Sequence, residues 1–308
     1  MTAHWWNALA VLPALLLSPL LLGIIGKTKA LAAGRKGAPL LQPYRDLLRL
    51  LGKGAVYGRT ATWVFRAAPA ISLAAILTAS LMLSAGPLAA PLAFSGDLVL
   101  FAYLLALSRF ALIAGAMDTG SAFEGMGASR EAAFSAFAEP AFFLVLGVLA
   151  WEEKALSLSA ILGGADVASW SAKIPSLALA ATALFLILLA ENSRIPVDDP
   201  ATHLELTMIH EVMVLDHSGP DLAFILYGSA LKLWLFSAVL VSMFMFSSGP
   251  AWVSMALFLG GMFGVAVLVG VTESVMARLR LGRVPQLLGL AAVLAGLAAL
   301  LLMAGGRP

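Results

Sequence analysis

Long apolar stretches alternate with short polar segments along all 308 residues of the chain. A helix needs about 20 mostly apolar residues to cross the hydrocarbon core of a bilayer. Eight stretches meet this requirement, and we expect membrane-spanning helices over residues 5–26, 67–88, 97–117, 131–151, 174–192, 222–247, 251–272 and 285–305. The pattern therefore predicts an all-α, polytopic integral membrane protein in which residues 1–308 form a single membrane domain.

The lysines and arginines between the expected spans lie mostly on one side of the membrane. If the chain crosses at every span, loops 27–66, 118–130, 191–221 and 273–284 share a side and carry 14 basic residues, against three on the other side. An excess of basic residues marks the cytoplasmic loops of membrane proteins. We therefore expect these four loops in the cytoplasm and both chain termini outside it.

Two of the cytoplasmic loops differ sharply in charge. Loop 27–66 has nine basic residues and a single acid, whereas loop 191–221 has seven acids and one arginine. A helix is expected within the acidic loop, with Asp199 as its N-cap, Pro200 in its first turn and Gly219-Pro220 at its end. The near-neutral net charge of +2 therefore arises from a basic and an acidic loop on one face.

The composition excludes several classes of protein. Hydrophobic residues make up 61% of the chain and charged residues 12%, which excludes a disordered chain and a water-soluble monomer. The chain has no cysteine, so it can form no disulfide and can provide no thiolate ligand for zinc, nickel or an iron–sulfur cluster. It also lacks a P-loop, a dinucleotide-binding glycine motif and a zinc-protease motif.

Five ionisable residues lie within or at the ends of expected spans. Burying a charge at membrane depth is costly unless it is paired or hydrated, so such residues are candidates for function. They are Arg109, Glu139, Glu191, Lys232 and Glu273. Arg109 and Lys232 either form internal ion pairs or belong to an ion path. For Glu139 and Glu191 we favour proton handling, because a carboxyl group in a low dielectric holds its proton more strongly.

Three histidines and one amphipathic segment complete the set of candidates. His203, His210 and His217 recur every seven residues and would share one face of a helix. A metal site would need two of them within one turn, so contacts at a partner interface or a proton relay are favoured.

Residues 42–53, QPYRDLLRLLGK, predict either a helix lying on the membrane surface or a docking platform for a soluble partner.

Three segments resemble a known family. They are GRKGAPLLQPYRDLLRLLGK at 34–53, ENSRIPVDDPATHLELTMIHEVMVLDHSGPDLAF at 191–224 and TESVMARLRLGRVPQLL at 272–288. Together they resemble the membrane subunit shared by respiratory complex I, where it is known as subunit 1, and by group 4 [NiFe] hydrogenases such as formate hydrogenlyase and hydrogenase-4. Residues 200–205, PATHLE, replace the glutamate cluster of the quinone-reducing members, so the chain resembles the hydrogenase branch.

The resemblance implies roles for individual residues. Residues that would belong to a proton or ion path are Glu139, Glu191, Arg194, Asp198, Asp199, Glu205, Glu211 and Glu273. Arg109 and Lys232 are added to this path chiefly on the cost of their burial. Residues that would face a soluble arm are Arg35, Gln42, Tyr44, Arg45, Asp46, Arg278 and Arg280.

The resemblance also implies a function and partners. It implies a non-catalytic subunit in the bacterial inner membrane that anchors a soluble electron-transfer arm, through loops 27–66 and 191–221, and couples it to proton or sodium translocation. The expected partners are hydrogenase-like large and small subunits, a ferredoxin-like iron–sulfur subunit and antiporter-like membrane subunits. The [NiFe] centre and the iron–sulfur clusters would lie in those partners. The alternatives are the quinone-binding subunit of an NADH- or ferredoxin-quinone oxidoreductase and a stand-alone secondary transporter.

Overall fold

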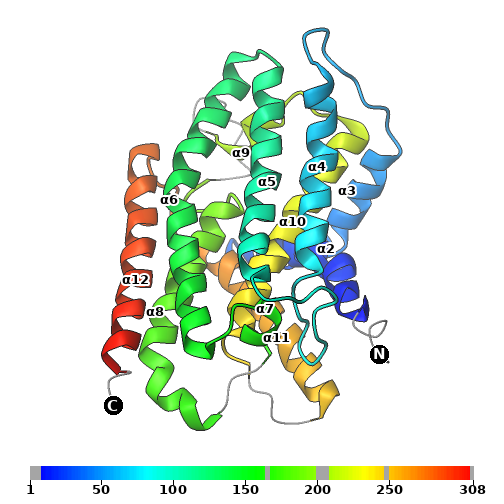
Figure 1. Ribbon diagram of the computed structural model, residues 1–308. Coiled ribbons are helices and arrows are strands. Elements are labelled where there is room, and N and C mark those ends of the chain that lie inside the picture. Colours follow the sequence, from blue (N-terminus) through cyan, green and yellow to red (C-terminus); the bar gives the residue numbers. More distant parts are fainter. Residues whose placement is uncertain (1–7, 164–166, 199–207, 246–249, 306–308) are drawn as a thin grey trace.

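The chain forms a bundle of helices packed side by side (Figure 1). A computed structural model describes residues 8–163, 167–198, 208–245 and 250–305. Eight long helices are α2 (Leu12–Ala32), α4 (Trp63–Ser80), α5 (Asp97–Asp118), α6 (Ala122–Glu153), α8 (Val167–Glu191), α10 (Gly219–Ser242), α11 (Ala251–Val275) and α12 (Val284–Gly305). Each is long and apolar enough to cross a membrane, and the described residues form no β-strand. The predicted all-α, eight-span membrane protein is confirmed.

Five short elements accompany the long helices, and four of them lie between two long helices. They are the 3₁₀ helices η1 (Ala8–Val11) and η2 (Leu281–Arg283) and the α-helices α3 (Gln42–Leu51), α7 (Leu158–Ile161) and α9 (His210–Met213). The amphipathic segment predicted at 42–53 is α3, which packs against α2 and α10. Its assignment as a surface helix or as a docking platform stays a prediction.

Helix α10 occupies the centre of the bundle. It packs against α2, α4, α8 and α11, whereas α12 packs against α6 and α8 at one edge (Figure 1). Its C-terminal half, from Ala230 to Ser242, is buried on all sides. A helix buried all round is expected to be apolar on all faces. The exception is Lys232, which is 8% exposed and therefore needs a partner inside the protein.

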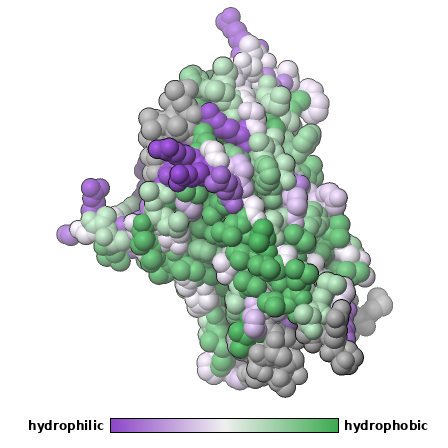
Figure 2. Space-filling view, turned by 90° about the vertical axis from the view of Figure 1, so that its left-hand side faces the viewer, coloured by the Kyte–Doolittle hydropathy of each residue, from purple (hydrophilic) through white to green (hydrophobic). Residues whose placement is uncertain are grey.

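The outer surface matches a protein that lies in a bilayer. Figure 2 shows hydrophobic side chains over most of the middle and lower part of one side, with strongly hydrophilic ones gathered higher up. Exposed apolar side chains include Leu144, Trp151, Val267 and Leu268. Such a surface is stable against lipid chains rather than against water. The side of the membrane on which each loop lies stays a prediction.

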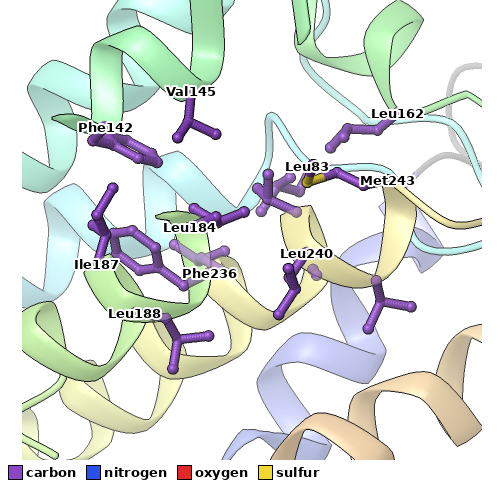
Figure 3. Packing of buried hydrophobic residues seen from close by; sticks show 14 of the residues in the cluster. Leu83, Phe142, Val145, Leu162, Leu184, Ile187, Leu188, Phe236, Leu240 and Met243 are labelled. Carbon is purple, nitrogen blue, oxygen red and sulfur yellow. The ribbon is translucent and has the colours of Figure 1, made fainter. Parts of the chain in front are cut away.

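The interior is filled by aliphatic and aromatic side chains from most of the long helices. Figure 3 shows Phe142 and Val145 of α6, Leu184, Ile187 and Leu188 of α8 and Phe236 of α10 in one cluster. The rings of Phe142 and Phe236 are 5.1 Å apart between centroids. Because lipid chains are as apolar as these side chains, close packing rather than removal from water holds the helices together.

The upper ends of α4 and α5 are joined by one carboxylate. Asp118, at the end of α5, accepts hydrogen bonds from the Thr62 hydroxyl at 2.8 Å and from the backbone N–H of Thr62 at 2.7 Å. Thr62 is the N-cap of α4, and its hydroxyl accepts from the Val64 N–H. Further along, Gly115 lets α5 approach α4 so closely that a Cβ there would lie 2.8 Å from the Cβ of Ala68. These contacts fix the position of Arg109 on α5.

Several expectations about helix limits are wrong: α4 ends at Ser80 rather than at 88, and α2 continues to Ala32 rather than ending at 26. Helix α6 begins at Ala122 rather than at 131, and its 32 residues extend about 48 Å, well beyond the roughly 30 Å of hydrocarbon. Gly219-Pro220 does not end a helix in the acidic loop but begins α10. Gly219 adopts a φ of +57° that suits glycine, and Pro220 fits a first turn because the N–H that it lacks has no helical partner there.

Candidate functional site

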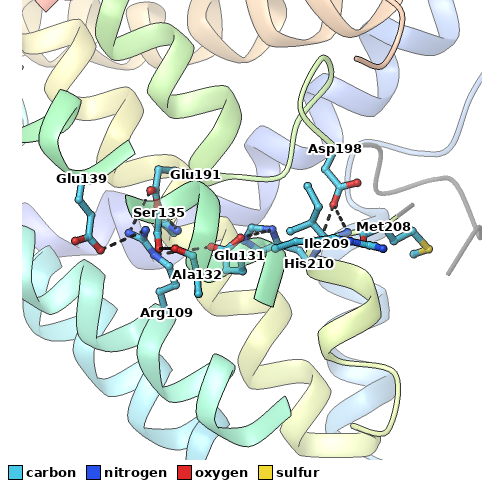
Figure 4. Close-up of polar contacts among 12 residues, drawn as sticks. Arg109, Glu131, Ala132, Ser135, Glu139, Glu191, Asp198, Met208, Ile209 and His210 are labelled. Carbon is cyan, nitrogen blue, oxygen red and sulfur yellow. Dashed lines mark hydrogen bonds and ion pairs between the residues drawn. The ribbon is translucent and has the colours of Figure 1, made fainter. Parts of the chain in front are cut away.

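Arg109 lies at the centre of a buried group of ionisable side chains (Figure 4). Its side chain is 7% exposed and faces three glutamates. The guanidinium is 3.1 Å from the Glu191 carboxylate at the end of α8, 3.4 Å from Glu139 and 3.8 Å from Glu131, both on α6. The internal pairing considered for Arg109 is present, and it joins three different helices.

Lys232 extends the group from α10. Its ammonium lies 2.7 Å from Glu191 Oε2, while Arg109 lies at the other oxygen, Oε1. Glu191 is therefore held between two cations, and its side chain is only 5% exposed. Of the three carboxylates around Arg109, that of Glu139 is the exception, since its side chain is 43% exposed on the outside of the bundle. The group therefore reaches from the centre of the protein to its lateral surface.

The charges of this group do not balance. Three carboxylates, those of Glu131, Glu139 and Glu191, face the two cations Arg109 and Lys232. One negative charge is in excess when all three carboxylates are ionised and nearby histidine is neutral. An excess charge in a low dielectric is costly, so the group favours one further positive charge. This imbalance is the chemical property that distinguishes the group from a set of structural ion pairs.

A histidine and an aspartate extend the group towards the acidic loop. His210 Nδ1, on α9, lies 3.4 Å from Glu131 Oε2. Asp198 accepts hydrogen bonds from the backbone N–H groups of Ile209 and His210 at 3.1 and 3.2 Å, and its other oxygen is 2.9 Å from the Arg278 guanidinium (Figure 4). Polar contacts therefore run continuously from Lys232 to α9, and Asp198 links α9 to Arg278.

A cavity of about 220 Å³ lies beside these residues. Its polar lining includes Arg109, Glu131, Glu191, His210 and Lys232. Further lining residues are Ser72 and Ser108, whose hydroxyls are 2.7 Å apart, Arg194 and Glu211. A cavity with this volume and lining accommodates several ordered water molecules. Ion pairs and water would then form one hydrogen-bonded network.

A second group of charges lies at the end of α11. Glu273 is buried and pairs with Lys29 of α2 at 2.8 Å and with Arg194 at 3.4 Å. Lys29, expected in the first loop, belongs to α2, which continues to Ala32. Because Arg194 also lines the cavity, it connects this second group to the first. Glu273 therefore ties α2 and α11 to the segment that follows α8.

The loop that carries α9 is attached to α6 at several points. Arg130 donates to the carbonyl oxygen of Met208 at 2.8 Å, and Glu124 accepts from the backbone N–H of Asp216 at 3.0 Å. A Cβ at Gly127 would lie 2.4 Å from a methyl of Val212, so only glycine allows this approach. The loop thus covers the cavity and places His210 against Glu131.

The histidines are arranged differently from the prediction. His210 belongs to α9, and His217 lies beyond the end of that helix, so these two share no helix. His217 instead stacks on Phe65 of α4, with ring centroids 4.0 Å apart and planes 2° apart. The described residues contain no cluster of potential metal ligands. His203, Asp199 and Glu205 lie outside the described residues, as does the expected start of the helix in this loop.

The residues expected to dock a soluble arm fall into two sets. Arg35, Arg45 and Arg280 are exposed. The others make contacts within the chain: Gln42 donates to Asp46 at 2.8 Å, Tyr44 donates to the carbonyl oxygen of Leu16, and Arg278 pairs with Asp198. Whether any of them contacts a partner stays a prediction.

The candidates predicted from the sequence do not include two buried glutamates of α6. Glu131 lies at the border of an expected span and Glu124 in an expected loop, yet they are 5% and 0% exposed. The signal was present, because Glu124, Glu131 and Glu139 are spaced by seven and eight residues and such a spacing brings side chains to one face of a helix. The expected helix start at 131 hides this spacing, because Glu124 then falls outside the helix.

Acid is expected to weaken the contact between His217 and Phe65. The pKa of His217 lies below its ordinary value of 6.5, because burial penalises the charged imidazole; Asp221 and Asp216 oppose this effect only in part. As the pH falls below 6.5, the unfolded chain takes up a proton that the folded chain resists, so the free energy of unfolding decreases by about 1.4 kcal/mol per unit of pKa shift. The loss stops below the pKa of the folded state.

This pH effect is measured by thermal unfolding of the detergent-solubilised chain above and below pH 6.5. His217→Phe keeps an aromatic ring against Phe65 but cannot be protonated, so its stability is expected to depend less on pH than that of the unaltered chain. Equal losses of stability on acidification in the two chains would show that His217 is not responsible.

The fold and the site define a class of protein. The chain is a multi-pass membrane protein whose helices enclose a connected group of ionisable side chains and a cavity. The family model described as NADH dehydrogenase matches residues 6–304, and the chain belongs to this family. The resemblance to the complex I and group 4 hydrogenase membrane subunits is confirmed.

Named relatives come from both branches. Formate hydrogenlyase subunit 4 of Escherichia coli (strain K12) is 31% identical over 279 residues, covering 88% of this chain and 89% of the relative. Hydrogenase-4 component C of the same organism is 31% identical and covers 75% and 72%. A subunit of the NADH-quinone oxidoreductase of Syntrophotalea carbinolica (strain DSM 2380 / NBRC 103641 / GraBd1) is 29% identical and covers 78% and 74%.

A solved structure has the same fold. The membrane-bound sulfane sulfur reductase, described as an archaeal respiratory membrane complex, contains a chain that superposes with a TM-score of 0.82 at 20% sequence identity. The match covers 96% of this chain and 98% of that one.

Proposed function

We propose that the chain is the membrane subunit of an energy-converting complex of the formate hydrogenlyase or hydrogenase-4 type. It anchors a soluble electron-transfer arm and couples electron transfer to movement of protons or sodium ions across the bacterial inner membrane. The observation that carries the proposal is the buried group around Arg109, with its one excess negative charge. Relatives of the two hydrogenase types, at 31% identity, support this choice of complex.

The coupling step follows from the contacts of α9. His210 is the ionisable side chain of α9 that faces Glu131, and the α9 loop is held by Asp198, Arg130 and Glu124. A redox change in the docked arm that displaces this loop would change the distance between His210 and Glu131. That would alter the affinity of the Arg109 group for its balancing proton, as a two-state coupling requires.

The chain itself performs no redox chemistry in this proposal. It has no cysteine with which to hold an iron–sulfur cluster or a [NiFe] centre. Partners of the hydrogenase large- and small-subunit type would supply the [NiFe] centre, a ferredoxin-like subunit would supply iron–sulfur clusters, and antiporter-like subunits would extend the membrane part.

Purification of the tagged full chain in mild detergent tests this assignment. The expected result is that soluble subunits copurify, that metal analysis finds nickel as well as iron, and that the preparation evolves hydrogen from an artificial electron donor. Iron without nickel together with reduction of a soluble quinone would instead favour the quinone-linked complex. A chain that purifies alone and transports ions alone would contradict both.

Charge reversal of a docking residue makes the test specific. Arg35→Glu is expected to lower the yield of copurified soluble subunits at least tenfold, since a like charge facing an acidic partner costs several kcal/mol and about 1.4 kcal/mol is already tenfold. Lys154→Glu is the matched control, because Lys154 is also exposed but follows the C-terminal end of α6, away from the first loop. Equal losses in the two variants would show that loop 27–66 does not dock the arm.

A further inference from the structure

An apolar groove of about 440 Å³ lies between α2, α3, α4 and α10. It shares no lining residue with the cavity beside Arg109. Leu16, Leu48 and Leu51 line it and are 62%, 70% and 49% exposed, so the groove opens at the outer surface of the bundle. In a bilayer, side chains exposed in this way contact lipid chains rather than water.

The side-chain hydroxyls in the groove already donate hydrogen bonds within the chain. Pro19 has no N–H, so the carbonyl oxygen of Leu15 lacks its usual helical donor. The Tyr227 hydroxyl donates to this oxygen at 2.8 Å, and the Tyr44 hydroxyl donates to the neighbouring carbonyl of Leu16. These phenols are the only side-chain donors among the described residues that line the groove.

This arrangement restricts what can bind. A quinone ring carries carbonyl oxygens, which only accept hydrogen bonds, and a buried acceptor without a donor is costly. An alkyl chain needs no donor and gains from contact with the leucines. The interior of the groove is therefore matched to a hydrocarbon chain rather than to a polar ring.

Two arginines flank the groove on α3. Arg45 and Arg49 are four residues apart, so they lie on one side of the helix, next to Tyr44 and Leu48 of the groove face. Both arginines are exposed, whereas the acid of this helix, Asp46, accepts a hydrogen bond from Gln42. An amphipathic helix with basic residues beside its apolar face suits the boundary between acyl chains and anionic headgroups.

We propose that this groove is a binding site for an anionic phospholipid, with an acyl chain along Leu16, Leu48 and Leu51 and the phosphate between Arg45 and Arg49. Arginine recognises phosphate through paired hydrogen bonds, which a zwitterionic lipid satisfies less well because its own ammonium competes. The proposal does not depend on which electron acceptor the complex uses.

A bound lipid would also act on the adjoining segment. The chain leaves α3 through Gly54, which contacts Gly219 at the start of α10, and the Val56 N–H donates to the Ser218 hydroxyl at 3.0 Å. A lipid that holds α3 against α2 and α10 therefore steadies the first loop where it meets the segment between α9 and α10. The site would orient the surface that we propose for docking.

Photo-cross-linking tests the site directly. The full chain, with any subunits that stay bound, is reconstituted in phosphatidylcholine vesicles that contain either phosphatidylglycerol or phosphatidylcholine with a diazirine in one acyl chain. After irradiation, labelled peptides are identified by mass spectrometry. We expect the phosphatidylglycerol probe to label α2 and α3 about 25-fold more than the phosphatidylcholine probe, because each arginine adds roughly fivefold in affinity for an anionic lipid.

Variants distinguish this site from general contact with lipid. In Arg45→Gln/Arg49→Gln, labelling by the two probes is expected to become equal. In Arg59→Gln, which removes an exposed arginine of the same loop but lies beyond α3, the preference is expected to persist. Both variants should keep the melting temperature of the unaltered chain, because all three arginines are exposed. Equal labelling by the two probes in the unaltered chain would overturn the proposal, as would displacement of the label by decylubiquinone.

Discussion

Replacing Arg109 by methionine is expected to destabilise the chain by about 3–5 kcal/mol, the cost of breaking a buried ion pair by removing one partner. Methionine has a similar length and is apolar, so the change removes the charge without leaving a large cavity. Glu131 and Glu139 then lose the cation that they face, and Lys232 remains beside Glu191 alone. Lysine at position 109 should be a poor substitute, because one ammonium cannot reach three carboxylates as a guanidinium does.

The measurement is thermal unfolding in detergent, together with the amount of chain found in the membrane fraction. Arg280→Met is the control, since Arg280 is exposed and a surface change of this kind usually costs less than about 0.5 kcal/mol. If Arg109→Met is as stable as this control, the carboxylates do not depend on the guanidinium. Adding Glu131→Gln to Arg109→Met should recover part of the loss, because it removes one of the unpaired charges.

Replacing Glu191 by glutamine is expected to leave the complex assembled and active in electron transfer but to abolish most ion translocation. The substitution lowers the number of carboxylates to two, which equals the number of cations, so the group no longer has an excess negative charge. A unit charge at 4 Å contributes about 4 kcal/mol at an effective dielectric of 20, close to three decades in proton affinity. The coupling proton would then have no electrostatic reason to bind.

In Glu191→Gln, Lys232 loses its ion-pair partner, which could destabilise the chain, so a second variant is needed to keep the prediction testable. Glu139→Gln balances the charges in the same way, and its half-exposed side chain contacts Arg109 alone among the cations of the group. Glu153→Gln is the control. Glu153 is exposed and is the last residue of α6, away from the Arg109 group. Translocation is followed in membrane vesicles by a pH-sensitive dye or by sodium uptake, and electron transfer by hydrogen evolution. Unchanged translocation in both Glu191→Gln and Glu139→Gln would refute the proton role of this group.

The position of Glu139 explains why both variants matter. It pairs with Arg109 on one side and is exposed on the other, on a helix whose exposed side chains also include Phe137 and Phe143. A half-exposed carboxylate at membrane depth is costly in lipid. Within the proposed function, this surface adjoins another membrane subunit, which would receive the ion from the Arg109 group.

Much of the architecture was predictable because it depends on local pattern. The eight spans follow from runs of apolar residues, since each helix must satisfy its own backbone hydrogen bonds in lipid. The amphipathic period of residues 42–51 is likewise visible without any tertiary contact. The errors were also local. Gly219-Pro220 is compatible with the end of one helix and with the start of the next, and the polar first turns of α6 resemble a loop.

By itself, the sequence determined that this is an eight-span membrane protein of a particular family and that Arg109, Glu139, Glu191 and Lys232 are unusual for their position. Only the tertiary structure decided that these four residues meet, that Glu131 and His210 join them, and that Glu273 belongs instead with Lys29 and Arg194. The physical reason is that hydropathy is a property of each segment. An ion pair depends instead on how helices far apart in sequence are rotated and packed against one another, and the balance of charge depends on which residues that packing brings together.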